Sequence, residues 1–291
     1  MQIQTFSILT GSEACNARCP FCISKMTPNG GVQLEEPEVN WRNLRIACRL
    51  AERCGVTTAM LTGKGEPTLF PEQITRYLQA LAEFNFPLVE LQSNGILLAE
   101  RANVYSPHLR DWYELGLTTI AVSIVHHHPE KNRRIFLPHK QAYIDLPALI
   151  RTLHDCGFSV RLACTLASGF IDGSQGLQAL VAFAREHQVE QLTVRPVNKP
   201  SNSRNLEAQN WADEHHLRPE QLDDIRCFLE HNGALLMTLI HGARVYDVDG
   251  QNVCLTDSLT LDARSDDLRQ LIFFPDGHLR YDWQYQGAIL L

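Results

Sequence analysis

Residues 3–22 read IQTFSILTGSEACNARCPFC, a short apolar run followed by three cysteines. The run Ile3–Leu9 predicts a β-strand, because apolar and β-branched residues dominate it. Cys15, Cys19 and Cys22 follow in the spacing C-x3-C-x2-C. The sequence therefore places three thiols in the loop that leaves the first strand, where barrel enzymes carry their chemistry.

Strand-like and helical patterns alternate over the first two-thirds of the chain, which is typical of βαβ units and a parallel sheet. We predict strands at Ile3–Leu9, Thr57–Leu61, Leu88–Gln92, Thr118–Val125, Ser159–Leu166 and Gln191–Val197. We predict helices between them at Trp41–Cys54, Pro71–Phe84, Pro107–Leu115, Leu146–Cys156 and Gly176–His187. Six such units predict an α/β fold, a partial, open (β/α)6 TIM-type barrel.

The pattern changes after the sixth predicted strand. Asn198–Glu214 is polar and predicts a loop, and Pro219–Asn232 predicts a helix. Leu271–Tyr281 contains two apolar runs around a Pro-Asp-Gly turn and predicts a β-hairpin. We therefore expect two parts, a barrel over residues 1–200 and a C-terminal cap or extension over residues 201–291.

The bulk composition is that of an acidic globular protein. The formal net charge is −7, which argues against broad, sequence-blind binding to nucleic acid. No apolar stretch approaches the length of a membrane span, and the N-terminus lacks the pattern of a secretory signal. The chain has nine cysteines, an odd number and mostly isolated, which favours a reducing compartment and hence the cytoplasm.

The cysteine triplet is compatible with more than one kind of site. Three thiolates in one short loop could wrap one face of an iron–sulfur cubane, and one iron would then remain open to a chelating small molecule. Structural zinc usually takes four ligands, and no second C-x2-C or His pair follows, although His126–His128 could be enlisted. Three unrelated thiols are the remaining alternative.

The triplet, with Phe21 before its last cysteine, resembles the signature of the radical SAM superfamily. Further segments resemble landmarks of that superfamily in the same order. Thr62–Thr68, with the sequence TGKGEPT, is similar to its Gly-Gly-Glu-Pro segment. Ser93–Gly95, and Ser123 with the nearby Pro129–Lys131, are similar to the branch that contains the molybdenum-cofactor cyclases. The resemblance covers Ile3 to Val197.

This resemblance implies an enzyme with two cofactors, a [4Fe–4S] cluster on the three cysteines and S-adenosylmethionine. A one-electron reductant such as flavodoxin or ferredoxin would supply the electron that cleaves S-adenosylmethionine. The resulting radical would abstract hydrogen from a small substrate, such as a nucleotide-like or phosphorylated compound. Modification of a peptide or protein, and a non-catalytic iron–sulfur or zinc module, are the alternatives.

The resemblance also implies which residues contact S-adenosylmethionine. Glu66 offers a carboxylate for the ammonium of the methionine part, in a loop whose glycines permit a close approach. The expected cofactor-binding residues are Phe21, Gly63, Gly65, Glu66, Pro67, Asn94, Ser123, Arg161 and Thr165. Val125 and Ala163 replace a carboxylate and an amide that relatives often carry, so Arg161 or Thr165 is expected to contact the ribose instead.

Substrate clues come from cationic and imidazole side chains. His126, Arg133 and Arg134 follow the fourth strand and could receive a phosphate, although a solvated helix face would have the same composition. Arg195 ends the sixth strand and is expected to anchor the substrate. The C-terminal part carries two isolated cysteines, Cys227 and Cys254, and no cysteine-rich motif, which predicts a single cluster.

Overall fold

The computed structural model describes all residues except 1–2, 198–202, 204, 240, 257–267 and 286. Its centre is a curved sheet whose first six strands run parallel and pair in chain order, as the predicted open barrel requires. These strands are β1 (Ile3–Leu9), β2 (Thr58–Thr62), β3 (Leu88–Ser93), β4 (Thr119–Ile124), β5 (Ser159–Leu166) and β6 (Gln191–Pro196). The sheet does not close on itself, so the predicted fold class is confirmed.

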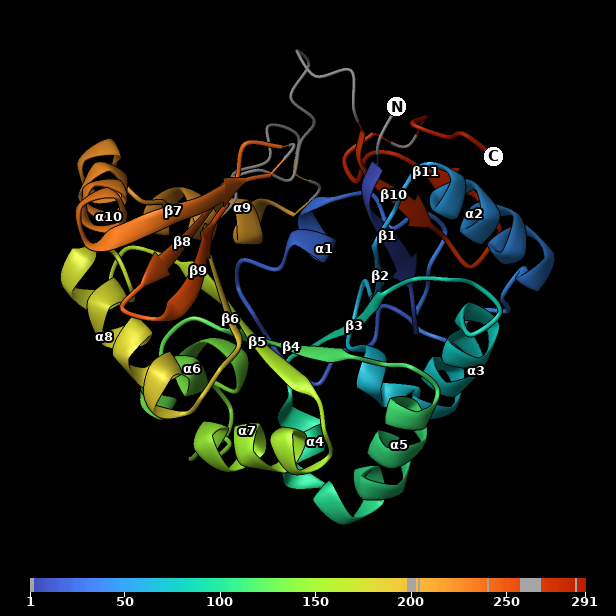
Figure 1. Cartoon of the computed structure of the whole chain (residues 1–291), viewed down its shortest axis with the longest axis horizontal. Coiled ribbons are helices and arrows are strands. Elements are labelled where there is room, and N and C mark those ends of the chain that lie inside the picture. The colour runs from blue at the N-terminus through green and yellow to red at the C-terminus, as the bar shows by residue number, and fades with distance from the viewer. Residues whose placement is uncertain (1–2, 198–202, 204, 240, 257–267, 286) are drawn as a thin grey trace.

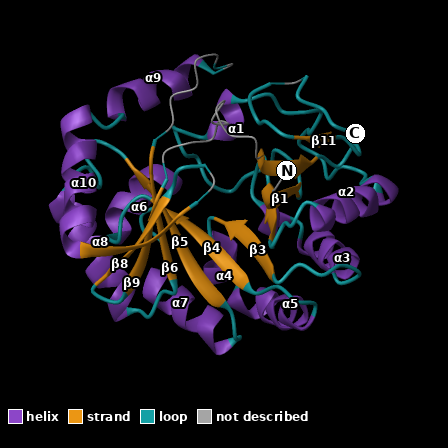
Figure 2. Ribbon diagram, turned by 45° about the horizontal axis from the view of Figure 1, so that its top comes forward, coloured by secondary structure: helices purple, strands orange, loops and turns teal. Residues whose placement is uncertain are grey.

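Helices alternate with these strands and cover the outer side of the sheet (Figures 1 and 2). They are α2 (Trp41–Arg53), α3 (Pro71–Leu81), α4 (Ile96–Glu100), α5 (Ala102–Glu114), α6 (Pro129–Phe136), α7 (Leu146–Asp155) and α8 (Ser174–Glu186). The short helix α1 (Ile23–Met26) lies apart from this layer. Local capping explains two starts: Asn40 Oδ1 accepts a hydrogen bond from Asn43 N at α2, and Asp145 Oδ1 accepts one from Ala148 N at α7.

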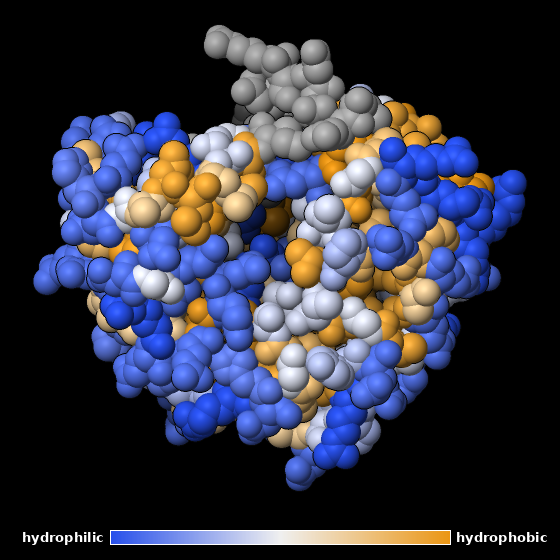
Figure 3. Space-filling model, in the orientation of Figure 1, coloured by the Kyte–Doolittle hydropathy of each residue, from blue (hydrophilic) through white to orange (hydrophobic). Residues whose placement is uncertain are grey.

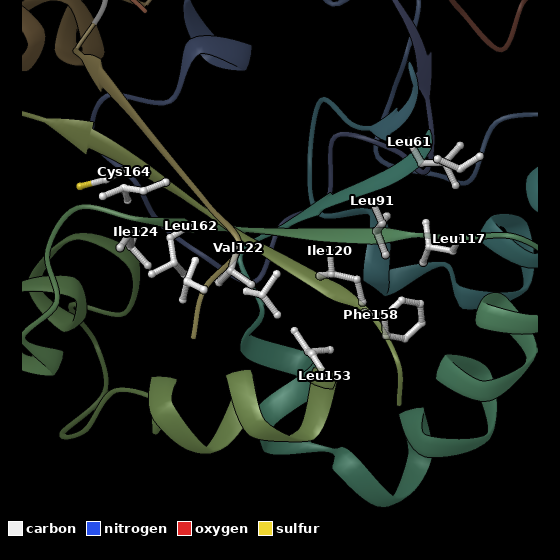
Figure 4. Packing of buried hydrophobic residues seen from close by; sticks show 14 of the residues in the cluster. Leu61, Leu91, Leu117, Ile120, Val122, Ile124, Leu153, Phe158, Leu162 and Cys164 are labelled. Atoms are coloured by element: carbon white, nitrogen blue, oxygen red, sulfur yellow. The ribbon is translucent and has the colours of Figure 1, made fainter. Parts of the chain in front are cut away.

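The main hydrophobic core lies between the sheet and these helices. On β5 the burial alternates, so that Val160, Leu162, Cys164 and Leu166 are buried against the helices while the intervening residues face the barrel interior. Figure 4 shows such side chains from neighbouring strands meeting Leu153 of α7. The alternation leaves the inner face of the strands to polar and charged residues.

The C-terminal part adds strands at both edges of the same sheet. Its elements are α9 (Leu206–His215), α10 (Pro219–Asn232), β7 (Gly233–Thr238), β8 (Arg244–Val248), β9 (Gln251–Leu255), β10 (Leu268–Phe273) and β11 (Leu279–Arg280). β9 pairs with β6 and β10 pairs with β1, both in parallel, and β10 forms the expected hairpin with β11. The division of the chain near residue 200 stays a prediction.

Two local predictions are wrong. Most of helix α9 (Leu206–His215) lies within the predicted loop Asn198–Glu214, and its start is stabilised by a hydrogen bond from Ala208 N to Asn205 Oδ1. Residues 198–202 and 204 of the predicted loop lie outside the described part of the chain. Helix α5 begins at Ala102 instead of Pro107, since a proline inside a helix removes one hydrogen bond without ending it here.

Candidate functional site

The cysteine loop joins the carboxyl end of β1 to α1, which begins directly after Cys22. Cys15, Cys19 and Cys22 line one cavity of about 220 Å³ at this end of the sheet. Burial raises the pKa of the Cys15 thiol to about 11 and raises that of Cys19 further. Metal or cluster binding therefore has to remove protons from these thiols.

Two groups of metal-ligand side chains follow strands of the sheet. Among the described residues, His126, His127 and His128 form a trio whose ligand atoms lie within 4.8 Å of one another. The three cysteines share the cavity at the carboxyl end of β1. Thiolates are the ligands of iron–sulfur clusters, and structural zinc usually takes four ligands, so the three thiols are one short of a complete zinc site.

The loop Gly63–Pro67 packs directly against the cysteine loop. Glu66 N donates a hydrogen bond of 2.9 Å to Ala14 O. At Gly65 a Cβ atom would lie 2.0 Å from the same oxygen, so the position accepts glycine alone. The two loops therefore hold each other in register.

The Glu66 carboxylate is buried at the centre of a hydrogen-bond network. Its Oε1 accepts from Thr68 N at 3.1 Å, Thr68 Oγ1 at 2.6 Å and Ser93 Oγ at 2.7 Å. Its Oε2 accepts from Asn94 N at 2.9 Å. Burial raises the pKa of Glu66, and these hydrogen bonds oppose the rise. Only Oε2 retains a free lone pair for a ligand.

The Ser93–Gly95 turn after β3 ties the site together. Gly95 adopts φ +71°, a left-handed conformation that glycine tolerates, and its N–H donates to Ser93 Oγ at 2.9 Å. Asn94 Nδ2 donates to Asn16 Oδ1 at 2.6 Å, and Asn94 Oδ1 accepts from Ile96 N at 3.0 Å. The Asn94 side chain thus connects the cysteine loop to helix α4.

Most of the predicted cofactor residues meet at the same cavity. Besides the three cysteines, its lining includes Phe21, Gly63, Gly65, Glu66, Pro67, Asn94, Ser123, Thr165 and Arg195. Figure 3 shows a hollow near the middle of this face, in the region between β6 and β1 of Figure 1. The Phe21 ring lies 5.2 Å from the Trp211 ring of α9, centroid to centroid.

The structure does not bring the other predicted residues to this cavity. Arg161 lies deeper in the barrel and forms an ion pair with Glu90. His126 is buried and packs against its two neighbouring histidines. Arg133 and Arg134 both pair with Glu130 on α6, as expected for a solvated helix face. None of these four lines the cavity.

Sequence reasoning missed two charged residues near the site. Lys64 is 5% exposed and lines the cavity, but the prediction for the Thr62–Thr68 segment assigns roles only to its glycines, Glu66 and Pro67. Glu90 is 4% exposed and lies two residues before Gln92, on the inner face of β3. The period-2 alternation of that strand was the signal that could have found Glu90.

Comparison with known proteins identifies the class. Residues 9–172 match the family model of the radical SAM superfamily, so the chain belongs to this superfamily and is an enzyme by class. The resemblance predicted from the motifs is thereby confirmed. Membership implies an iron–sulfur cluster and S-adenosylmethionine as cofactors.

Two curated relatives are named GTP 3′,8-cyclase. The protein from Aeromonas hydrophila subsp. hydrophila is 29% identical over 188 residues, which cover 62% of this chain and 51% of that protein. The protein from Aquifex aeolicus is 29% identical over 165 residues, which cover 55% and 47%. The chain thus spans about half the length of the curated relatives that it matches, and they belong to the branch that the motif order indicates.

Solved structures share the fold at low identity. Streptococcus suis SuiB bound to S-adenosylmethionine matches with a TM-score of 0.61 and 12% identity, over 96% of this chain and 60% of that one. A radical SAM methyltransferase from Sphaerobacter thermophilus matches with a TM-score of 0.58 and 14% identity, over 88% and 67%. Among the described residues, no helix combines the length and apolar character that a membrane span needs.

Proposed function

We propose that this chain holds one [4Fe–4S] cluster on Cys15, Cys19 and Cys22 and cleaves S-adenosylmethionine reductively. The observation that carries the proposal is the shared cavity, where the three thiols meet the Gly63–Pro67 loop and the ends of β3, β4 and β5. When bound, the reduced cluster would give one electron to the sulfonium of S-adenosylmethionine, whose C5′–S bond would break to release methionine and a 5′-deoxyadenosyl radical able to take a hydrogen atom from the substrate.

The protein's own contribution is to hold S-adenosylmethionine beside the cluster. Glu66 Oε2 is the acceptor with capacity left for the ammonium group. Ser123 and Thr165 line the same cavity at the carboxyl ends of β4 and β5, which supports a role for them in binding the ribose and the carboxylate. The backbone at Phe21 serves the adenine, and Asn94 holds the cysteine loop in position.

A small substrate suits the barrel better than a peptide. Behind the cofactor cavity lies a second cavity of about 270 Å³, lined by inner-face residues of the strands. This volume fits a small molecule, such as a nucleotide-like or phosphorylated compound, and offers little room for an extended chain. Flavodoxin or ferredoxin is the reductant that we expect.

The direct test is anaerobic reconstitution of the full chain with iron and sulfide, followed by reduction in the presence of S-adenosylmethionine. We expect about four irons per chain, as a cubane requires, and formation of 5′-deoxyadenosine. Cluster binding without any cleavage product would support a non-catalytic module instead. A single tetrahedral metal at the triplet would refute the cluster.

Glu66→Gln tests the role of the carboxylate. The amide group turns one acceptor oxygen into a donor that faces Asn94 N–H or the Thr68 and Ser93 donors. We expect about 1–3 kcal/mol lower stability in thermal unfolding, retention of the cluster, and weaker binding of S-adenosylmethionine in calorimetry. Unchanged affinity for S-adenosylmethionine would remove Glu66 from the binding site.

A further inference from the structure

The second cavity lies inside the barrel and adjoins the cofactor cavity. Seven residues line both cavities: Ile23, Ser24, Thr62, Gly63, Lys64, Gln92 and Arg195. A molecule bound in the inner cavity would therefore lie next to the group held in the outer one. Radical hydrogen abstraction needs such contact, so the inner cavity is the natural place for the substrate.

Its lining is cationic. The side chains of Lys64, Arg161, Arg195 and Arg269 line it together with His241, and no aspartate or glutamate among the described residues does so. The strand alternation brings the arginines there, because Arg161 and Arg195 occupy inner-face positions of the adjacent strands β5 and β6. Among the described residues the lining thus carries cationic side chains and no carboxylate, which favours an anionic ligand.

The charge of Arg161 is compensated by the protein. Its Nη2 donates to Glu90 Oε1, and Glu90 is 4% exposed just beneath the cavity lining. The same carboxylate oxygen also accepts from Gln92 Nε2 at 3.1 Å. This buried pair neutralises the Arg161 guanidinium and fixes its position.

Arg195 is not compensated. Within the part of the chain that the structure describes, its guanidinium has no hydrogen bond and no ion pair. Burial lowers its pKa, and the nearby Arg161 lowers it further. A half-buried cation facing a second cation costs stability unless an anion binds there.

Lys64 supplies a second positive charge that has no ion-pair partner among the described residues. Its Nζ donates to Thr27 Oγ1 at 2.8 Å and lies 5.4 Å from the centroid of the Trp283 ring, and no described carboxylate lies within ion-pair distance. Burial lowers its pKa to about 8, and the nearby Cys22 and Glu13 side chains oppose this shift. Lys64 and Arg195 both line the cavity without an ion-pair partner among the described residues, whereas Arg161 is paired with Glu90.

We propose that the inner cavity binds an anionic substrate with at least two negative charges, whose carboxylate or phosphate groups are held by Arg195 and Lys64. This proposal rests on the proposed function, since it names the substrate class of that site. Arg195 forms charge-assisted hydrogen bonds with one anionic group. Arg161, on the adjacent strand β5 and held by Glu90, orients the same anionic group. Lys64 acts as a point charge at the boundary with the cofactor cavity.

The test measures anion binding to the full chain by calorimetry, with inorganic pyrophosphate as one probe and succinate as the other. We expect saturable binding of at least one probe by the wild-type chain, and the tighter probe identifies phosphate or carboxylate as the recognised group. Arg195→Met should weaken that binding about tenfold to a hundredfold. The matched control is Arg185→Met, at an exposed arginine of α8, which should leave binding unchanged.

A second measurement separates binding from a structural role. Because the Arg195 charge lacks a partner, Arg195→Met should raise the thermal midpoint of the anion-free chain, whereas a structural arginine would lower it on removal. Absence of saturable anion binding by the wild-type chain, or a lowered midpoint in this variant, would overturn the proposal.

Failure of this proposal and failure of the proposed function remain distinguishable. Anion affinity is read without cleavage of S-adenosylmethionine, and it can be measured on the same preparation before and after cluster reconstitution. Anion binding with no 5′-deoxyadenosine would contradict the radical activity alone. 5′-Deoxyadenosine formation by a chain that binds neither probe would contradict the anionic substrate alone.

Discussion

Cys19→Ala is expected to abolish cluster binding and reduce 5′-deoxyadenosine formation to the background level. A cubane held by three thiolates loses a ligand when one is removed, and no further cysteine or histidine among the described residues lines the cofactor cavity to replace it. The fold should survive, because Cys19 only packs at the margin of a core that the sheet and helices build without it. The apo chain should lose about 1 kcal/mol of unfolding free energy. Iron analysis, product formation and thermal unfolding of the metal-free chain measure these effects.

Cys227→Ala is the matched control for the loss of a thiol. Cys227 is exposed on α10 and away from the cofactor cavity, so its removal should leave iron content and product formation at wild-type levels. Four irons per chain in Cys19→Ala would contradict the ligand assignment. Equal losses of iron and product in both variants would contradict a specific role for Cys19, because general oxidation of the preparation would explain both losses.

The barrel could be predicted from local sequence because its signals are local. The apolar run at Ile3–Leu9 and the alternation at Ser159–Leu166 give both strands their observed bounds. The edges of the sheet could not be predicted in this way. The pairing of β10 with β1 joins residues more than 260 positions apart, and no periodicity within either strand encodes its neighbour.

The site was predictable to the extent that it follows from topology. The carboxyl ends of parallel strands meet at one edge, which brings Glu66, Asn94 and Ser123 toward the cysteines. Partner choice was not predictable, since it depends on side-chain directions inside the barrel. Arg161 therefore pairs with Glu90 two strands away instead of lining the cofactor cavity.

Gly65→Ala is expected to separate the two loops that build the site. The added Cβ would lie 2.0 Å from Ala14 O and 2.7 Å from Ser12 O, and both are backbone atoms that no side-chain rotation can move away. Relief requires the cysteine loop to shift as a whole, which also breaks the hydrogen bond from Glu66 N to Ala14 O. We expect a loss of at least about 1–3 kcal/mol of unfolding free energy, together with poor cluster yield and weak binding of S-adenosylmethionine.

Gly176→Ala provides the matched substitution. Gly176 lies in α8, where a Cβ would meet Ile171 at 3.5 Å, an ordinary contact, and where alanine favours the helix by up to about 1 kcal/mol. The Gly176→Ala variant should have a thermal midpoint equal to or above that of the wild type, and it should bind a full complement of cluster. If Gly65→Ala behaved like Gly176→Ala, the close approach of the two loops would not be a requirement of the site. A loss confined to Gly65→Ala would mean that glycine is needed at residue 65 so that the Gly63–Pro67 loop can pack against the cysteine loop.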